Sequence, residues 1–190
     1  QLKPRVIEAS RTLWKIYLAL TLALFASLML AGMGTLDAIC HAFSTLATGG
    51  FSTRTASVGA FEDPVIEYIL IVFMLLAGIS FVQQYKLWVA NRPLEVIRDY
   101  EVRAYLTLVA VAALAITAVL AQAHELQTAA AWEQTFRTAL FQTTSILTTT
   151  GFVTTDYAMW QPVTQVVLLS LMFVGGCTGS TAGGLKVARF

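Results

Sequence analysis

Long apolar segments alternate with short polar stretches along this chain of 190 residues. The ranges 13–33, 64–88 and 104–121 are almost uncharged inside, and each is close to the ~20 residues that a membrane-spanning helix needs. A fourth apolar segment begins at Pro162 but runs only to Val174, which at ~1.5 Å per residue covers about 20 Å of a ~30 Å hydrocarbon core. We therefore predict three complete spans and one that is broken inside the membrane.

Two shorter helical segments, 37–47 and 131–147, lie between these spans. Asp37 and Glu133 stand near their starts, where an acidic side chain suits the positive end of a helix. We expect re-entrant helices that enter the membrane and turn back. The alternative is a pair of short amphipathic helices on the membrane surface.

Each short helix is followed by a turn rich in Thr and Gly. Aligning Gly50 with Gly151 also aligns Thr48 with Thr149 and Phe51 with Phe152, so one offset relates both turns. A recurring unit of this kind indicates an internal duplication. Non-helical backbone at membrane depth is tolerated only where it is buried in protein or lines a watery path. The two turns, 48–52 and 148–152, therefore predict a pore lining.

The composition supports a membrane protein, because 57% of the residues are hydrophobic and only 12% are charged. Cys40 and Cys177 have no metal-binding or redox spacing. His41 and His124 have no clustered partners, so we expect structural roles for them rather than metal binding. We assign no cofactor to this chain and interpret it as a piece of a longer protein.

A run of small residues interrupts the fourth apolar segment. Glycine is unfavourable inside a helix, so we expect this run to break the span within the membrane. Its pattern lacks the Lys-Ser/Thr ending of a phosphate-binding loop, so nucleotide binding is not expected. The run consists of Gly175, Gly176, Cys177, Thr178, Gly179, Ser180, Thr181, Ala182, Gly183 and Gly184.

Charge is segregated around the spans. The segments 1–12 and 91–103 and the end of the chain carry most of the basic residues, whereas the opposite side has only Arg54 and Arg137. By the positive-inside rule the basic side is cytoplasmic, so both short helices and both turns enter from outside. Arg137 either pairs with an acidic group or projects outward, and the sequence leaves both possibilities open.

Carbonyl rings at the ends of short helices can replace the hydration shell of a monovalent cation without burying a fixed charge. The repeated turns therefore favour an ion-selectivity filter, although Thr-rich turns can also simply satisfy backbone groups inside a bundle. A second alternative is a secondary transporter that binds a small solute at the broken span. An intramembrane enzyme is disfavoured, because His41, Cys40 and Ser44 lack a convincing catalytic partner.

The stretches 43–53, 145–152 and 175–186 resemble the Trk/Ktr/HKT superfamily of potassium transporters, most closely its bacterial membrane subunits. The resemblance covers essentially the whole chain and implies an all-α membrane protein built from span–re-entrant pore helix–span repeats of a potassium-channel-like architecture. The chain is similar to the second and third of four such repeats, 13–90 and 104–190, of which the last span is the broken range 162–190.

The resemblance also implies roles for residues. It makes Thr48, Gly49, Gly50 and Phe51 one quarter of a potassium filter and Thr149, Thr150, Gly151 and Phe152 another, with potassium as the transported ion. It makes the loop 175–184 a gate below the filter.

The partners that the resemblance implies are membrane lipid, the remaining repeats of the same protein, a second copy in a homodimer, and a cytoplasmic nucleotide-binding regulatory subunit of the TrkA type. No nucleic-acid partner is expected. The implied location is the bacterial inner membrane. Neither the preference for potassium over sodium nor the choice between a symporter and a channel follows from the residues themselves.

Overall fold

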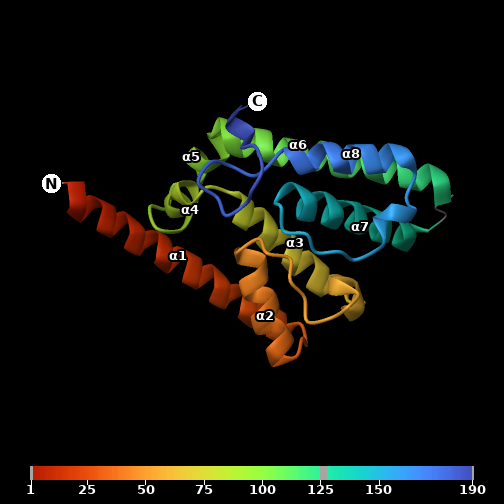
Figure 1. Cartoon of the computed structure of the whole chain (residues 1–190), viewed down its shortest axis with the longest axis horizontal. Coiled ribbons are helices and arrows are strands. Elements are labelled where there is room, and N and C mark those ends of the chain that lie inside the picture. The colour runs from red at the N-terminus through yellow and green to blue at the C-terminus, as the bar shows by residue number, and fades with distance from the viewer. Residues whose placement is uncertain (1, 125–127, 190) are drawn as a thin grey trace.

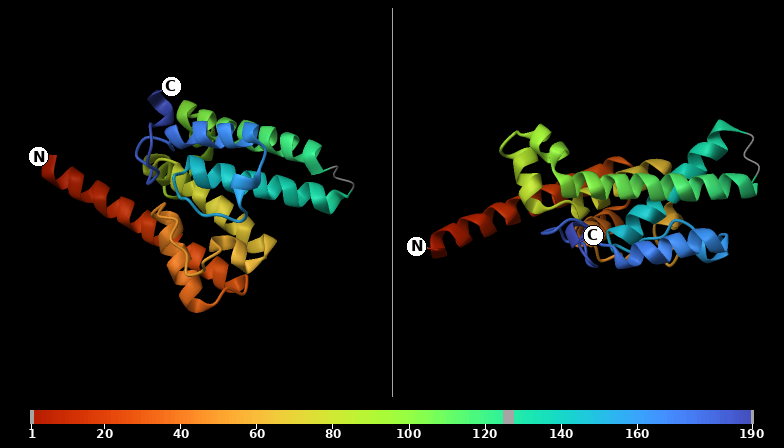
Figure 2. Two further views of the ribbon diagram at one scale, coloured as in Figure 1. Left: turned by 45° about the vertical axis from the view of Figure 1, so that its right-hand side comes forward. Right: turned by 90° about the horizontal axis from the view of Figure 1, so that it is seen from above.

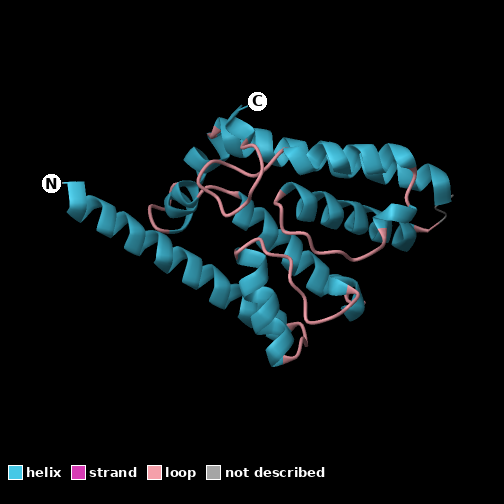
Figure 3. Cartoon of the chain, viewed as in Figure 1, coloured by secondary structure: helices cyan, strands magenta, loops and turns pink. Residues whose placement is uncertain are grey.

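The computed structural model describes residues 2–124 and 128–189, and the regular elements in these ranges are helices (Figure 3). They are α1 (Leu2–Leu30), α2 (Thr35–Leu46), α3 (Pro64–Gly78), α4 (Phe81–Trp88), α5 (Pro93–Arg98), α6 (Tyr100–His124), α7 (Ala129–Leu147) and α8 (Pro162–Phe173). Short 3-10 turns at Ser57–Phe61, Tyr157–Met159 and Val187–Arg189 lie in the connecting segments.

The helices form two groups that meet along α3 and α7 (Figure 1). Helices α1, α2 and α3 pack against one another, and α6, α7 and α8 form the second group. The N-terminal half of α1 extends away from both groups (Figure 2). Fully buried side chains fill each group: Leu24, Leu28, Leu70 and Met74 in the first, and Tyr105, Ile116, Leu147 and Leu168 in the second.

Among the described residues, two helices are long and apolar enough to cross a membrane, over Ser10–Leu30 of α1 and Tyr100–Gln122 of α6, and α3 with α4 is a third candidate if the bent pair is one span. Helices α1 and α6 agree with predicted spans, although α1 begins well before residue 13. Helix α8 has only 12 residues, or about 18 Å, so the predicted break in the last span is present. The short helices α2 and α7 lie within two residues of the predicted bounds.

The segment 64–88, predicted as a single span, is not one continuous helix. The segment divides into α3 and α4, which are bent by 111° relative to each other. Gly78 and Ser80 flank the break, a residue pair that commonly marks sharp helix kinks. Ser80 caps the new helix, since its Oγ accepts a hydrogen bond from the Val82 N–H at 3.3 Å. Tyr105 is fully buried beside Gly78, and a Cβ at Gly78 would lie 2.3 Å from its hydroxyl.

Candidate functional site: two filter turns and a glycine-rich loop

The turn after α2 has an unusual backbone. Thr48 has φ +50° and Gly50 has φ +68°, so two residues of the four adopt the left-handed region. Its start is held to the helix, because the Thr48 N–H donates to the Thr45 carbonyl at 3.0 Å and the Gly49 N–H to the Ser44 carbonyl at 2.7 Å. The chain therefore leaves α2 in a fixed direction.

The turn after α7 repeats this geometry. Thr149 has φ +56° and Gly151 has φ +88°. The Thr149 N–H donates to the Ile146 carbonyl at 3.0 Å, and the Thr150 N–H donates to the Ser145 carbonyl at 2.9 Å. Each of these donors and acceptors is equivalent to one in the first turn when Gly50 is aligned with Gly151.

A left-handed conformation is rare for a β-branched residue and costs about 1–3 kcal/mol. Its occurrence at Thr48 and at Thr149 means that the two turns share a strained backbone and not only a sequence pattern. Strain of this kind persists where the surroundings enforce it, commonly at ligand sites.

The two turns also touch. A Cβ at Gly50 would lie 2.0 Å from the Thr150 carbonyl oxygen, so only glycine allows the two backbones to approach this closely. The C-terminal ends of α2 and α7 therefore meet at one place. The last turns of both helices, which the structure describes completely, contain no basic residue. Their partial negative charge is thus available to a cation.

The glycine-rich loop is closed at its base by two backbone hydrogen bonds. The Gly175 N–H donates to the Leu185 carbonyl at 2.7 Å, and the Leu185 N–H donates to the Phe173 carbonyl at 3.1 Å. A Cβ at Gly175 would lie 1.8 Å from the Gly183 carbonyl oxygen, so the two sides of the loop are in direct backbone contact. The loop is closed and compact rather than an open kink, and its two ends pair in a parallel β-bridge between Val174 and Leu185.

This loop packs into the break between α3 and α4. The Cys177 N–H donates to the Gly78 carbonyl at 2.8 Å, and the Phe81 N–H donates to the Gly179 carbonyl at 3.1 Å. The Thr181 hydroxyl donates to the Ala77 carbonyl at 3.1 Å. Backbone groups that the helix break frees are therefore satisfied by the loop, as burial requires. This exchange is the physical reason for the interruption at residues 79–80.

The loop also contacts both filter turns through their first threonines. The Thr48 hydroxyl donates to the Thr181 carbonyl at 3.0 Å, and the Gly183 N–H donates to Thr149 Oγ1 at 2.7 Å. Both threonines are half-buried. The predicted filter residues and the predicted gate residues thus form one hydrogen-bonded assembly.

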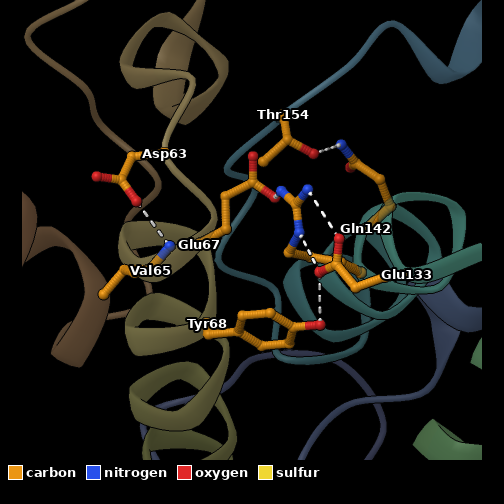
Figure 4. A network of polar contacts seen from close by, with 8 residues as sticks. Asp63, Val65, Glu67, Tyr68, Glu133, Gln142 and Thr154 are labelled. Carbon is orange, nitrogen blue, oxygen red and sulfur yellow. Dashed lines mark hydrogen bonds and ion pairs between the residues drawn. The ribbon is translucent and has the colours of Figure 1, made fainter. Parts of the chain in front are cut away.

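Arg137 pairs with acidic groups, which resolves the alternative that the sequence left open. Its guanidinium donates to Glu67 Oε2 of α3 at 2.6 Å and to Glu133 Oε1 of α7 at 2.8 Å (Figure 4). The Tyr68 hydroxyl donates to the same Glu133 oxygen at 2.9 Å. The hydrogen bond from Arg137 holds the pKa of Glu133 below its usual range. The cluster ties α7 to α3.

A second polar cluster fixes the start of α2. Asp37 accepts hydrogen bonds from the Thr53 hydroxyl at 2.5 Å and from the Arg54 guanidinium at 2.7 Å. These two bonds, with that from Thr53 the stronger influence, lower the pKa of Asp37. The acidic residue at the helix start therefore also holds the segment that follows the filter turn.

His41 has the structural role that the sequence predicted, but through a contact that the sequence did not indicate. The side chain is fully buried, and its ring stacks on Phe152 of the other turn with centroids 5.5 Å apart. Its Nδ1 lies 2.7 Å from the Asp37 carbonyl oxygen and its Nε2 lies 3.0 Å from Ser52 Oγ. The spacing of four residues from Asp37 fits a helix face, but no local pattern indicated a contact with a residue more than 100 positions away.

The structure brings most predicted site residues together. Thr48, Gly50, Thr149 and Thr150 meet at the helix ends, and the loop 175–184 lies against them. The two phenylalanines differ, since Phe152 is fully buried whereas Phe51 is 81% exposed. Phe152 packs behind its turn against His41, whereas Phe51 has no such packing within the described ranges.

Comparisons with known proteins give one family. A Trk system potassium uptake protein TrkH of Salmonella typhimurium is 42% identical over all of this chain, which covers 38% of that protein. The TrkG protein of Escherichia coli is 38% identical at the same coverage. The crystal structure of the potassium transporter TrkH from Vibrio parahaemolyticus superposes with a TM-score of 0.91 at 41% identity, over 98% of this chain and 40% of that one.

The chain therefore spans about two fifths of the length of these relatives. The sequence model described as "TrkH: Cation transport protein" matches residues 2–190. This family consists of transport proteins and not of enzymes. With a family match over almost every residue and the close structural likeness, the chain belongs to the TrkH family of cation transport proteins.

Proposed function

We propose that this chain forms two adjacent quarters of a potassium-conducting pore in the inner membrane of a bacterium. The observation that carries the proposal is the strained backbone shared by the two turns, with Thr48 and Thr149 both left-handed and Gly50 in contact with Thr150. Many helices end in a left-handed residue, usually glycine, but a threonine in that position followed two residues later by a left-handed glycine, in both turns, is not expected of two unrelated packing turns.

The ion binds to backbone carbonyls. Carbonyl oxygens replace the water of a monovalent cation without placing a fixed charge in the membrane. Thr48, Gly49, Gly50 and Phe51 contribute one set and Thr149, Thr150, Gly151 and Phe152 the other. The ends of α2 and α7, which lack basic residues in their last turns, add partial negative charge beside the ion. The names of the relatives support potassium as this ion.

The glycine-rich loop 175–184 gates the pore. Its hydrogen bonds to Thr48 and Thr149 hold it against the filter turns, and displacement of the loop opens the path. Each of these is a single bond between neutral groups, worth about 0.5–1.5 kcal/mol. Thermal motion or a regulatory subunit of the TrkA type can therefore displace the loop. The remaining repeats and a second copy of the protein complete the transporter, with the filter turns facing outward.

The proposal is tested by ion flux through the full-length protein in liposomes. Gly151→Ser adds a side chain at φ +88° within the filter, so we expect loss of potassium flux or entry of sodium. Thr107→Val on the exposed side of α6 is the control and should leave both fluxes unchanged. Normal potassium selectivity in Gly151→Ser would mean that the turns are packing elements only.

A further inference from the structure

The first half of the glycine-rich loop is attached to elements other than the filter turns. Two of the attachments are the hydrogen bonds of Cys177 and Gly179 to the break between α3 and α4. Between them, the Thr178 N–H donates to Glu101 Oε1 at 2.5 Å. Glu101 belongs to the first turn of α6, so the start of this helix lies against the loop (Figure 1).

The bond to Glu101 differs from the others because its acceptor is a carboxylate. The bonds that join the loop to the filter turns and to the helix break all connect neutral groups. A hydrogen bond to an ionised acceptor is about twice as strong as one between neutral groups. Glu101 forms no salt bridge within the described ranges, so no cation there competes with Thr178 for its oxygens.

Glu101 is itself fixed by the connection between α4 and α6. Asp99 Oδ1 accepts the Glu101 N–H at 3.1 Å and the Val102 N–H at 3.2 Å, and so caps the start of α6. Asp99 Oδ2 accepts a hydrogen bond from Gln83 Nε2 of α4 at 2.7 Å. A chain of hydrogen bonds therefore runs from α4 through Asp99 and Glu101 to the loop. The positive-inside rule places the segment 91–103, which carries both carboxylates, in the cytoplasm.

We propose that Glu101 is the positioning residue that holds the glycine-rich loop closed. Its carboxylate accepts the Thr178 N–H while the loop lies against the filter turns, and the loop leaves when this bond breaks. Because α4 and Asp99 fix Glu101, a regulatory partner that displaces the segment 81–103 moves the acceptor away and releases the loop. The link to conduction rests on the proposed gate, whereas the attachment of the loop to Glu101 does not.

The test uses Cys177, a free and fully buried thiol that directly precedes Thr178. A maleimide reaches this thiol when the loop opens, so its rate of modification in the purified full-length protein reports how often the loop opens. Mass spectrometry of the peptide that contains Cys177 separates this reaction from that of the exposed Cys40. We expect Glu101→Ala to raise the rate at least about tenfold, because the loop loses a bond to a charged acceptor.

Two conservative variants separate the accepting oxygen from the charge. Glu101→Asp keeps the charge but is one methylene shorter, so it should react nearly as fast as Glu101→Ala. Glu101→Gln keeps an oxygen at the same reach and should react at least about threefold more slowly than Glu101→Ala. Glu95→Ala is the control and should react like wild type, because it removes an exposed carboxylate of α5 that pairs with Arg92. Wild-type rates in Glu101→Ala and Glu101→Asp would overturn the proposal, and so would equal rates in Glu101→Gln and Glu101→Ala.

Thermal unfolding distinguishes opening of the loop from loss of the fold. If modification of Cys177 rises only together with a large fall in Tm, Glu101 stabilises the whole fold and the proposal is overturned. Potassium flux through the same variants tests the proposed gate separately. Faster modification in Glu101→Ala and Glu101→Asp without a rise in flux would support Glu101 as the residue that holds the loop and would refute the loop as the gate.

Discussion

Thr149→Val removes the hydrogen bond that joins the second filter turn to the glycine-rich loop. Valine keeps the shape and β-branching of threonine, so the strain at φ +56° is unchanged. The only group lost is the hydroxyl oxygen that accepts the Gly183 N–H at 2.7 Å. We expect the loop to leave the filter more often, and potassium flux to rise.

The size of the expected increase in potassium flux follows from the exposure of Gly183. Gly183 is exposed, so water can replace the lost acceptor, and the net cost is about 0.5–1.5 kcal/mol rather than the larger penalty of a buried unpaired group. At ~0.59 kcal/mol for RT, this changes the equilibrium between docked and displaced loop by about 2- to 13-fold. Flux should rise by at most this factor, because the first turn and the helix break still hold the loop.

The assay is potassium and sodium flux through the full-length protein in liposomes. Thr149→Ser keeps the acceptor and should behave like wild type, and Thr107→Val controls for a threonine change on an exposed helix face. Selectivity should be unchanged in all three, since the carbonyls remain in place. Equal potassium flux in Thr149→Val and Thr149→Ser would refute the idea that this bond holds the gate.

Three other changes test separate parts of the structure. Arg137→Ala leaves the Glu67 carboxylate buried without its partner, which should lower the free energy of unfolding by about 3–5 kcal/mol and lower the Tm. Adding Glu67→Gln to this variant should recover part of the lost stability. No recovery would argue against the ion pair. Asp37 has a lowered pKa, so its stabilising bonds are present above its ordinary value of 3.8 and are lost as pH falls through the lower folded value. The Tm difference between wild type and Asp37→Asn should therefore shrink from about pH 7 to about pH 3, and a constant difference would contradict this assignment. Gly175→Ala would place a Cβ 1.8 Å from the Gly183 carbonyl oxygen, so this variant should open the loop and raise basal potassium flux. Gly34→Ala is the control and should not change the flux, because its Cβ would lie 3.9 Å from the nearest atom. Equal flux in both variants would mean that the base of the loop does not control conduction.

The sequence predicted the parts of the site that depend on local chemistry. Length and apolarity located the short helices, and the Thr/Gly pattern located both turns, because only a few residue types allow the backbone to leave a helix in this way. The break before Gly175 followed from the same reasoning, since a run of glycines cannot continue a helix.

Contacts between segments that are distant in the sequence could not be predicted from local sequence patterns. Gly78 and Ser80 favour a kink but do not by themselves divide the helix, and the break at this point also depends on hydrogen bonds with Cys177 and Gly179 about 100 residues later. The difference between exposed Phe51 and buried Phe152 likewise depends on which unit lies beside each ring, not on the residues of the turn. Local pattern specifies the repeated unit, whereas the position of the unit in the assembly specifies its surroundings.

In the proposed pore, the threonine at the first filter position takes part in both ion binding and gating. Glycine at Thr48 or Thr149 would relieve about 1–3 kcal/mol of strain, since both residues are left-handed. It would also remove the hydroxyl that reaches the loop at Thr181 or Gly183. In the proposed pore the strain is therefore tolerated where one residue serves both tasks, since its backbone carbonyl lies in the filter and its side-chain hydroxyl holds the gate. A change that keeps the β-branched side chain, such as Thr149→Val, therefore loosens the proposed gate alone, whereas a change to glycine alters the backbone that binds the ion as well.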